Sequence, residues 1–421
     1  MSEASTSPHL LSNASWYLLE KMVRLAGAFL IGAWVARHLG PDDYGALAYA
    51  LALIATLGFL GSWGVESLVV RDLSQGSLDR QQVVSTYFFV KLGGAALVPV
   101  LAASYLTISH PHDERLMWLA LVCSGTVLLG AFDVADCWLQ ARQQARTTSL
   151  IRLMGFIAGA LLRCSLVILG APVVWFAVAV LVEALLIACL YGRLMQQHQL
   201  LPRWKACHPD EFKRLLQDGK MMALSGLTVA IYSKVDVLAM GALLPTEVLG
   251  PYAMAASMCA AWNMVGMSLV QAWAPRISQA FQGGREIYLS WLRRMLWVML
   301  GVSVAGSAVL SLCASWIFEL LLGSAYASGV PVFAVMIWSA VPVFLGVATS
   351  QIIVNEKIYW VSMLRTTLGV TVSLAAIAPV ASTWGGVGVA SLVVLSAAVA
   401  TSGILFSSAA RTTLARVFFH S

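Results

Sequence analysis

Charged side chains inside long apolar stretches are the residues of this sequence best suited to bind a ligand. Lys21 and Arg24 lie three residues apart in the apolar run 14–36, so both face one side of a helix. A charge in hydrocarbon costs about 2.5–3.5 kcal/mol even on lenient scales, so such groups need a function or a partner. Several cations around a water-filled cavity can hold a phosphate or pyrophosphate through charge-assisted hydrogen bonds. The predicted substrate-binding residues of this cationic cavity are Lys21, Arg24, Lys91, Arg163 and Lys234.

Acidic residues in or near the same apolar runs predict a second role, the coupling of transport to protons or ions. The candidates for this role are Glu66, Asp133 and Asp236. Internal neutralisation is the competing interpretation, since Glu20 and Arg24 at spacing i,i+4 can pair on one helix. Arg152 and Arg365 lie near the ends of their runs, where a long side chain can reach the membrane surface.

The remaining sequence patterns predict no enzyme chemistry. The sequence contains no catalytic triad, no metal-binding cluster and no phosphate-binding loop, so we expect neither a cofactor nor a metal. The net charge of +6 follows from membrane topology and requires no nucleic-acid partner.

Long apolar stretches are the elements that must position these charged groups. The 421 residues are 59% hydrophobic and only 11% charged, which excludes a disordered chain and a typical soluble domain. Stretches of about 20 apolar residues recur along the whole length, as in helical membrane proteins. The twelve predicted spans are 14–36, 44–69, 83–107, 115–138, 148–170, 172–192, 219–241, 249–272, 291–313, 329–354, 359–381 and 385–407. We therefore predict an all-α polytopic membrane protein with twelve transmembrane helices.

The basic residues of the connections predict the orientation of these helices. When the connections are taken alternately from the N-terminal tail, one set holds seventeen Lys and Arg residues and the other holds two. The positive-inside rule places the first set in the cytoplasm. Both termini are then cytoplasmic, which requires an even number of spans and supports the number twelve.

The basic stretch 193–218 is a predicted cytoplasmic linker between two halves of six spans each. The halves share a pattern, because LGPDDYGALAYA at 39–50 aligns with LPTEVLGPYAMA at 244–255 at an offset of 205 residues. We predict an N-terminal bundle of residues 1–200 and a C-terminal bundle of 201–421 around a central cavity. Repeats of this kind suit alternating access to a site between them.

Several segments resemble one known family. These are SNASW (12–16), VARHLGPDDYGALAYALAL (35–53), GVESLVVRDLS (64–74), DCWLQARQQARTTSLIRL (136–153) and SKVDVLAMGALLPTEVLGPYAMA (233–255). They are similar to the polysaccharide repeat-unit flippases (Wzx type), which belong to one superfamily with the MATE drug exporters and the lipid II flippases. The resemblance implies two six-helix bundles whose first and seventh spans line the cavity. Lys21, Arg24 and Lys234 are the cavity cations that it implies by position.

The resemblance also implies an activity, a location and partners. Such a protein moves an undecaprenyl-pyrophosphate-linked oligosaccharide, for example an O-antigen unit of lipopolysaccharide, to the outer leaflet of the bacterial inner membrane. Its partners would be the lipid-linked oligosaccharide and the lipid bilayer, and a polysaccharide polymerase and chain-length proteins are further candidates. A multidrug exporter of the same fold is the nearest alternative, although it should favour an acidic cavity. A membrane glycan polymerase or ligase is the second, although it typically carries a large outer loop.

Overall fold

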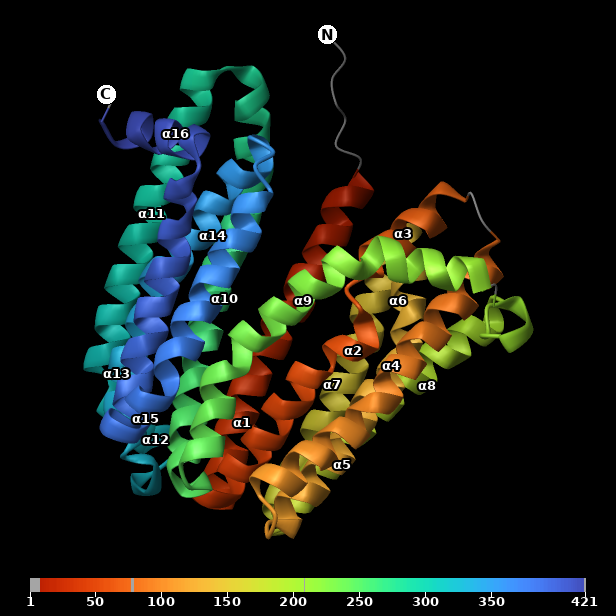
Figure 1. The fold of residues 1–421 in the computed structure, drawn as a ribbon, viewed down its shortest axis with the longest axis vertical. Coiled ribbons are helices and arrows are strands. Elements are labelled where there is room, and N and C mark those ends of the chain that lie inside the picture. Colours follow the sequence, from red (N-terminus) through yellow and green to blue (C-terminus); the bar gives the residue numbers. More distant parts are fainter. Residues whose placement is uncertain (1–7, 77–78, 208, 420–421) are drawn as a thin grey trace. The chain divides into compact units, whose positions relative to one another are not determined.

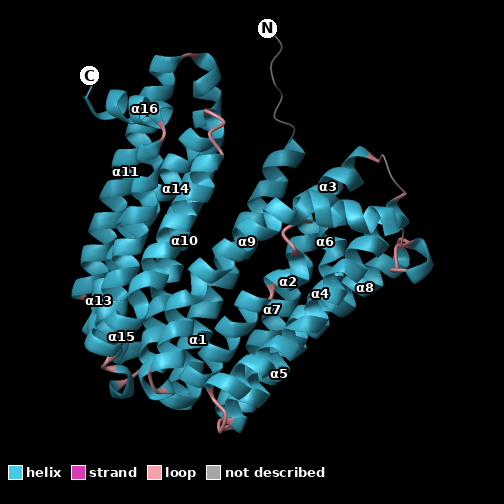
Figure 2. Cartoon of the chain, in the orientation of Figure 1, coloured by secondary structure: helices cyan, strands magenta, loops and turns pink. Residues whose placement is uncertain are grey.

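The computed structural model describes residues 8–76, 79–207 and 209–419, and within them all regular secondary structure is helical (Figure 1 and Figure 2). The backbone of residues 8–23 is described, but the side chains of Glu20 and Lys21 lie outside the described part of the chain. The pairing of Glu20 with Arg24 and the role of Lys21 therefore stay predictions.

The first of two compact units comprises the described residues of Met1–Leu39 and Ala46–Ala230. Its helices are α1 (Pro8–Leu57), α2 (Phe59–Ser62), α3 (Glu66–Gln75), α4 (Arg80–Ser109), α5 (Glu114–Leu129), α6 (Val134–Ala141), α7 (Ala145–Ile168), α8 (Val173–Gln197) and the start of α9 (Pro209–Leu243). Val69, Tyr87, Trp138 and Tyr191 belong to one buried cluster that joins α3, α4, α6 and α8. Three of these helices, α3, α4 and α6, contribute Glu66, Lys91 and Asp136 to the pocket described below.

The second compact unit comprises Gly40–Gly45 and the described residues of Ile231–Ser421, so α1 and α9 contribute to both units. Its further helices are α10 (Thr246–Gly283), α11 (Arg285–Leu312), α12 (Ala314–Leu321), α13 (Gly329–Met336), α14 (Ala340–Asn355), α15 (Trp360–Ser402) and α16 (Ser408–Phe419). Met295, Phe344 and Ile352 belong to the buried cluster that packs α11 against α14. The boundary between the two compact units therefore lies within α9, between Ala230 and Ile231. The predicted bundle boundary at residue 200 stays a prediction.

The helices confirm a polytopic membrane protein with twelve spans. In the described residues, ten helical segments are long and apolar enough to cross a membrane. Two of them, Gly27–Gln75 and Trp360–Phe406, have 49 and 47 residues, which is enough for two crossings each at about 20 residues a crossing. Each is interrupted by a glycine with positive φ, Gly40 at 77° and Gly385 at 55°. The bends divide these segments in two and raise the number of spans to twelve.

The predicted span 44–69 is wrong in one respect, because it is not a continuous helix. Trp63 and Gly64 have positive φ of 51° and 63° and separate α2 from α3. A Cβ atom on Gly64 would lie 3.0 Å from the carbonyl oxygen of Met222 in α9, so glycine permits this close approach of two backbones. The break places Glu66 in the first turn of α3, where a negative charge is favourable.

The parts of the aligned segments that belong to the second unit, residues 41–45 and 246–250, lie in direct contact. A Cβ atom on Gly45 would lie 2.9 Å from the amide nitrogen of Gly250, and one on Gly250 would lie 2.8 Å from the carbonyl carbon of Pro41. The nearest neighbour of Gly45 is the carbonyl oxygen of Thr246, whose hydroxyl donates a hydrogen bond to Asp42. At the offset of 205, Pro41 corresponds to Thr246 and Gly45 to Gly250, so the two glycine contacts are equivalent under the repeat.

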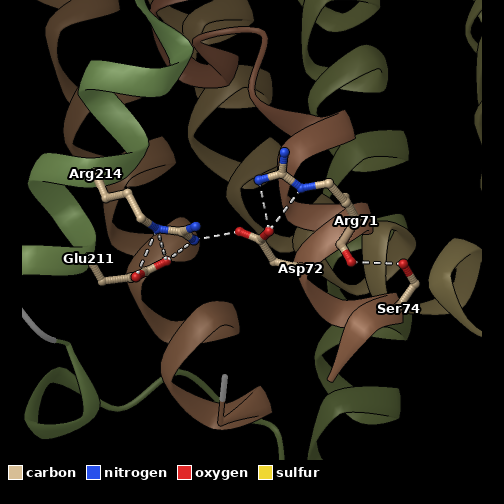
Figure 3. A network of polar contacts seen from close by, with 5 residues as sticks. All are labelled: Arg71, Asp72, Ser74, Glu211 and Arg214. Carbon is tan, nitrogen blue, oxygen red and sulfur yellow. Dashed lines mark hydrogen bonds and ion pairs between the residues drawn. The ribbon is translucent and has the colours of Figure 1, made fainter. Parts of the chain in front are cut away.

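An ionic network joins α3 to the first turns of α9 (Figure 3). Asp72 is buried and accepts hydrogen bonds from Arg214 and from Arg71, the latter at 3.1 Å from Nη2. Arg214 also donates to the buried carboxylate of Glu211. The hydrogen bonds to Glu211, and then the one to Asp72, raise the pKa of Arg214, so its guanidinium stays charged. The network therefore fixes the polar start of α9 on the first unit.

Asp72→Asn is expected to lower the stability of the purified protein by about 1–3 kcal/mol, because it removes the charged acceptor shared by two arginines. Thermal unfolding in detergent measures the effect as a lower melting temperature. Asp218→Asn is the matched control, since Asp218 is an exposed carboxylate of α9 and takes no part in the network. Equal melting temperatures for the two variants would show that the network does not stabilise the fold.

Candidate functional site

A charged pocket lies among α3, α4, α6 and α7 of the first unit. Its volume is about 580 Å³. Five ionisable side chains line it, and they are Glu66, Lys91, Asp133, Asp136 and Arg152. Gly64, Ser67, Val70, Cys137 and Gln140 complete the lining. The pocket therefore combines two cationic groups with three carboxyl groups in a membrane-spanning unit.

A 3-10 turn over Gly130–Asp133 positions the two aspartates of the pocket. It connects α5 to α6 and places Asp133 at the end of the turn and Asp136 in the first turn of α6. Residues at spacing i,i+3 are neighbours on one face of a helix. Both carboxyl groups consequently face the same pocket.

Asp136 is the best-anchored carboxylate of the site. It is buried, and its Oδ2 accepts hydrogen bonds from Arg152 Nη2 at 2.8 Å and from Gln140 Nε2 at 2.9 Å. The hydrogen bond from Arg152 is charge-assisted, and it joins α6 to α7. Its Oδ1 is also buried and has no hydrogen-bond partner among the described residues. This oxygen is available to accept a proton or a hydrogen bond from a ligand.

Lys91 of α4 contributes a buried cation to the lining of the pocket. Lys91 is only 6% exposed, and its Nζ lies 5.5 Å from the centre of the Tyr87 ring, within cation–π distance. Lys91 and Arg152 both interact electrostatically with Asp133. Lys91 forms no ion pair within the described part of the chain. Its ammonium group therefore has hydrogen-bond donors to offer to a ligand.

A second cavity of about 360 Å³ adjoins this pocket. Glu66, Lys91 and Asp133 line both cavities. The second cavity is otherwise mostly apolar, with Leu51 and Ile54 of α1 in its wall. The three shared side chains thus lie at the boundary between the charged pocket and the mostly apolar second cavity.

The structure brings together three of the residues predicted from sequence, Glu66, Lys91 and Asp133, although two different roles were predicted for them. Asp136 and Arg152 belong to the same pocket and were not predicted as site residues. A signal in the sequence that could have identified them is the i,i+3 spacing of Asp133 and Asp136. This spacing places two carboxyl groups on one helix face, and a membrane-embedded arginine follows in the next span.

The other predicted residues lie elsewhere. Arg163 of α7 forms an ion pair with Glu183 of α8, so each neutralises the other, and its role as a substrate ligand stays a prediction. Arg24 is an exposed residue of α1. Lys234 and Asp236 belong to the second unit. Lys234 is half-buried in α9, and Asp236 accepts a hydrogen bond from the Tyr252 hydroxyl at 2.9 Å.

A protein-family model provides the decisive comparison. The model described as "Polysaccharide biosynthesis protein" matches residues 10–281, which is more than half of the chain. The chain belongs to this family. The match includes all five ionisable residues of the charged pocket. No curated protein sequence matches the chain.

Solved structures with low sequence identity share the fold of this family member. The inward-facing conformation of a multidrug resistance MATE transporter of the MOP superfamily is 16% identical, with 94% of this chain and 96% of that chain covered and a TM-score of 0.72. The lipid II flippase MurJ in an inward closed conformation is 12% identical, with coverages of 97% and 92% and a TM-score of 0.75. The Vibrio cholerae MATE transporter VcmN is 14% identical, with coverages of 97% and 98% and a TM-score of 0.60. These proteins are transporters or flippases, and the likeness confirms the fold predicted from sequence.

Proposed function

We propose that this polysaccharide biosynthesis protein is a flippase and not an enzyme. Its substrate would be an undecaprenyl-pyrophosphate-linked oligosaccharide repeat unit, moved by alternating access from the cytoplasmic to the outer leaflet of a bacterial inner membrane. The observation that carries the proposal is the family match over residues 10–281 in a chain of twelve membrane spans. The excess of basic residues in one set of connections supports cytoplasmic termini.

The charged pocket provides a mechanism by which the first unit could respond to its substrate. In this proposal Lys91 binds the anionic pyrophosphate, while Glu66 and Asp133 bind and release a proton or a cation. Lys91 and these carboxyl groups line the same two cavities, so a change in the charge of one alters the electrostatic potential at the other. Lys21, Arg24, Arg163 and Lys234 remain proposed substrate contacts, and Asp236 remains a proposed coupling group.

Lys91→Gln is expected to slow the flipping of a lipid-linked oligosaccharide by about tenfold or more, since a hydrogen bond to a charged group contributes about 1.5–3 kcal/mol. The measurement is the rate at which an undecaprenyl-pyrophosphate-linked sugar, incorporated in proteoliposomes, becomes accessible to an external glycosidase. Lys213→Gln is the control, because Lys213 is an exposed lysine of α9 outside both cavities. Equal rates in wild type and in Lys91→Gln would remove Lys91 from the site.

Export of an amphipathic cation is the second candidate function. The observation that favours it is the excess of carboxyl groups over cationic groups in the charged pocket. The same proteoliposomes, loaded with a fluorescent hydrophobic cation under an imposed proton gradient, distinguish the two candidates. Transport of the cation without flipping of the lipid-linked sugar would replace the flippase proposal.

A further inference from the structure

A pocket of about 370 Å³ with a mostly apolar lining lies within the second unit, among α9, α14 and the two halves of α15. Arg365 is the one ionisable Lys, Arg, Asp or Glu side chain in its lining. The hydroxyl-bearing residues Tyr232, Ser350, Thr366 and Thr401 surround it. A half-buried arginine in a membrane span therefore faces a mostly apolar space that holds several hydroxyl groups.

Arg365 has no acidic partner in the described part of the chain. Its Nε donates one long hydrogen bond, 3.3 Å, to the carbonyl oxygen of Ala400. Two half-buried arginines of the first unit differ, because Arg152 pairs with Asp136 and Arg163 pairs with Glu183. An unpaired charge at this depth is costly, and several N–H groups of the guanidinium are left to bind an anion.

Glycine at position 346 lets the guanidinium lie inside the pocket. A Cβ atom on Gly346 would lie 2.6 Å from Arg365 Nη2 and 2.8 Å from Thr401 Oγ1. Thr401 already donates its hydroxyl proton to the carbonyl of Pro342 at 2.7 Å, so its position is fixed. The close approach to the backbone of α14 thus holds the guanidinium at a defined place.

The surroundings of Arg365 suit a molecule with an anionic head and an apolar body. Val343, Val347 and Ile353 provide apolar wall, and Val354 and Tyr359 at the rim are more than half exposed. Tyr359 caps α15, and Trp360, its first residue, is also more than half exposed. Trp and Tyr are typical of the headgroup level of a membrane. The guanidinium therefore lies close to the depth at which lipid phosphates are found.

We propose that Arg365 binds a phosphate group in this pocket, and that the phosphate belongs to a membrane lipid whose acyl chain contacts the apolar wall. The planar guanidinium can donate two parallel hydrogen bonds to phosphate oxygens. The site goes beyond the proposed flipping activity, because it requires no transport and lies entirely within the second unit.

Native mass spectrometry of the full-length protein in detergent tests the proposal. The probes are phosphatidylglycerol, a diacylglycerol that lacks the phosphate, and inorganic phosphate. We expect wild type to retain phosphatidylglycerol in preference to diacylglycerol, and Arg365→Gln to reduce that retention by about tenfold. Arg294→Gln, which removes an exposed arginine of α11, should leave it unchanged.

Two further variants keep the test decisive if Arg365→Gln aggregates. Gly346→Ala keeps the arginine but displaces its guanidinium, and Arg365→Lys keeps the charge but loses the paired donors, so both should retain less phosphatidylglycerol than wild type. Wild-type retention in every folded variant would overturn the proposal. Arg365-dependent binding of inorganic phosphate, without Arg365-dependent retention of phosphatidylglycerol, would overturn the assignment to a lipid.

Discussion

Gly45→Ala is expected to lower the melting temperature of the purified protein by about 5 °C or more. The added Cβ would overlap the carbonyl oxygen of Thr246 and lie 2.9 Å from the amide nitrogen of Gly250. These neighbours are backbone atoms, so no side-chain rotation relieves the overlap and two helix starts must separate. Overpacking costs about 1–3 kcal/mol and occasionally more, and 1 kcal/mol shifts melting by about 2–4 °C in a domain of this size.

Gly32→Ala is the control for this substitution. Gly32 lies in the same helix, and no atom comes within 4 Å of the position its Cβ would take. Alanine is a better helix former than glycine, so Gly32→Ala should leave melting unchanged or raise it slightly. Gly250→Ala should behave as Gly45→Ala does, and the double variant should cost less than the sum because both changes open one contact. Equal melting of Gly45→Ala and Gly32→Ala would contradict the argument.

The spans and the alignment of Gly45 with Gly250 were predicted from the sequence, whereas their contact was not. Hydropathy located the spans, since each must satisfy its backbone within an apolar stretch of fixed length, and the basic residues of alternate connections supported the number twelve. The offset of 205 aligned Gly45 with Gly250, and the structure adds that the aligned segments touch. The break at Trp63 and Gly64 escaped prediction because it depends on the backbone of α9, which is remote in sequence.

The candidate site was reached only in part. Intramembrane charge identified Lys91, Glu66 and Asp133, because charge in hydrocarbon is costly wherever it occurs. Hydropathy could not tell which charges meet, since pairing depends on helix rotation and packing. Arg163 meets Glu183 on the next helix, whereas Arg365, predicted to reach the membrane surface, lies in a pocket without an acidic partner.

Arg152→Ala is expected to cost about 3–5 kcal/mol of stability, the largest effect that we predict for a charged residue. Asp136 is buried, and without Arg152 it retains a single hydrogen bond from Gln140. The melting temperature of the purified variant measures the loss. Arg146→Ala is the control, because Arg146 is an exposed arginine in the first turn of the same helix. Equal melting of the two variants would show that Asp136 does not depend on Arg152.

A double replacement separates the structural role of this pair from a role in transport. Arg152→Met with Asp136→Leu removes both charges and replaces them with apolar side chains, and such changes are often neutral or stabilising. We expect the double variant to melt near wild type and yet to flip the lipid-linked sugar more slowly, because the pocket keeps Lys91 and Asp133 but loses the carboxylate oxygen available for a proton. Recovery of stability together with full flipping would make the pair a purely structural contact and leave Lys91, Glu66 and Asp133 as the working part of the pocket.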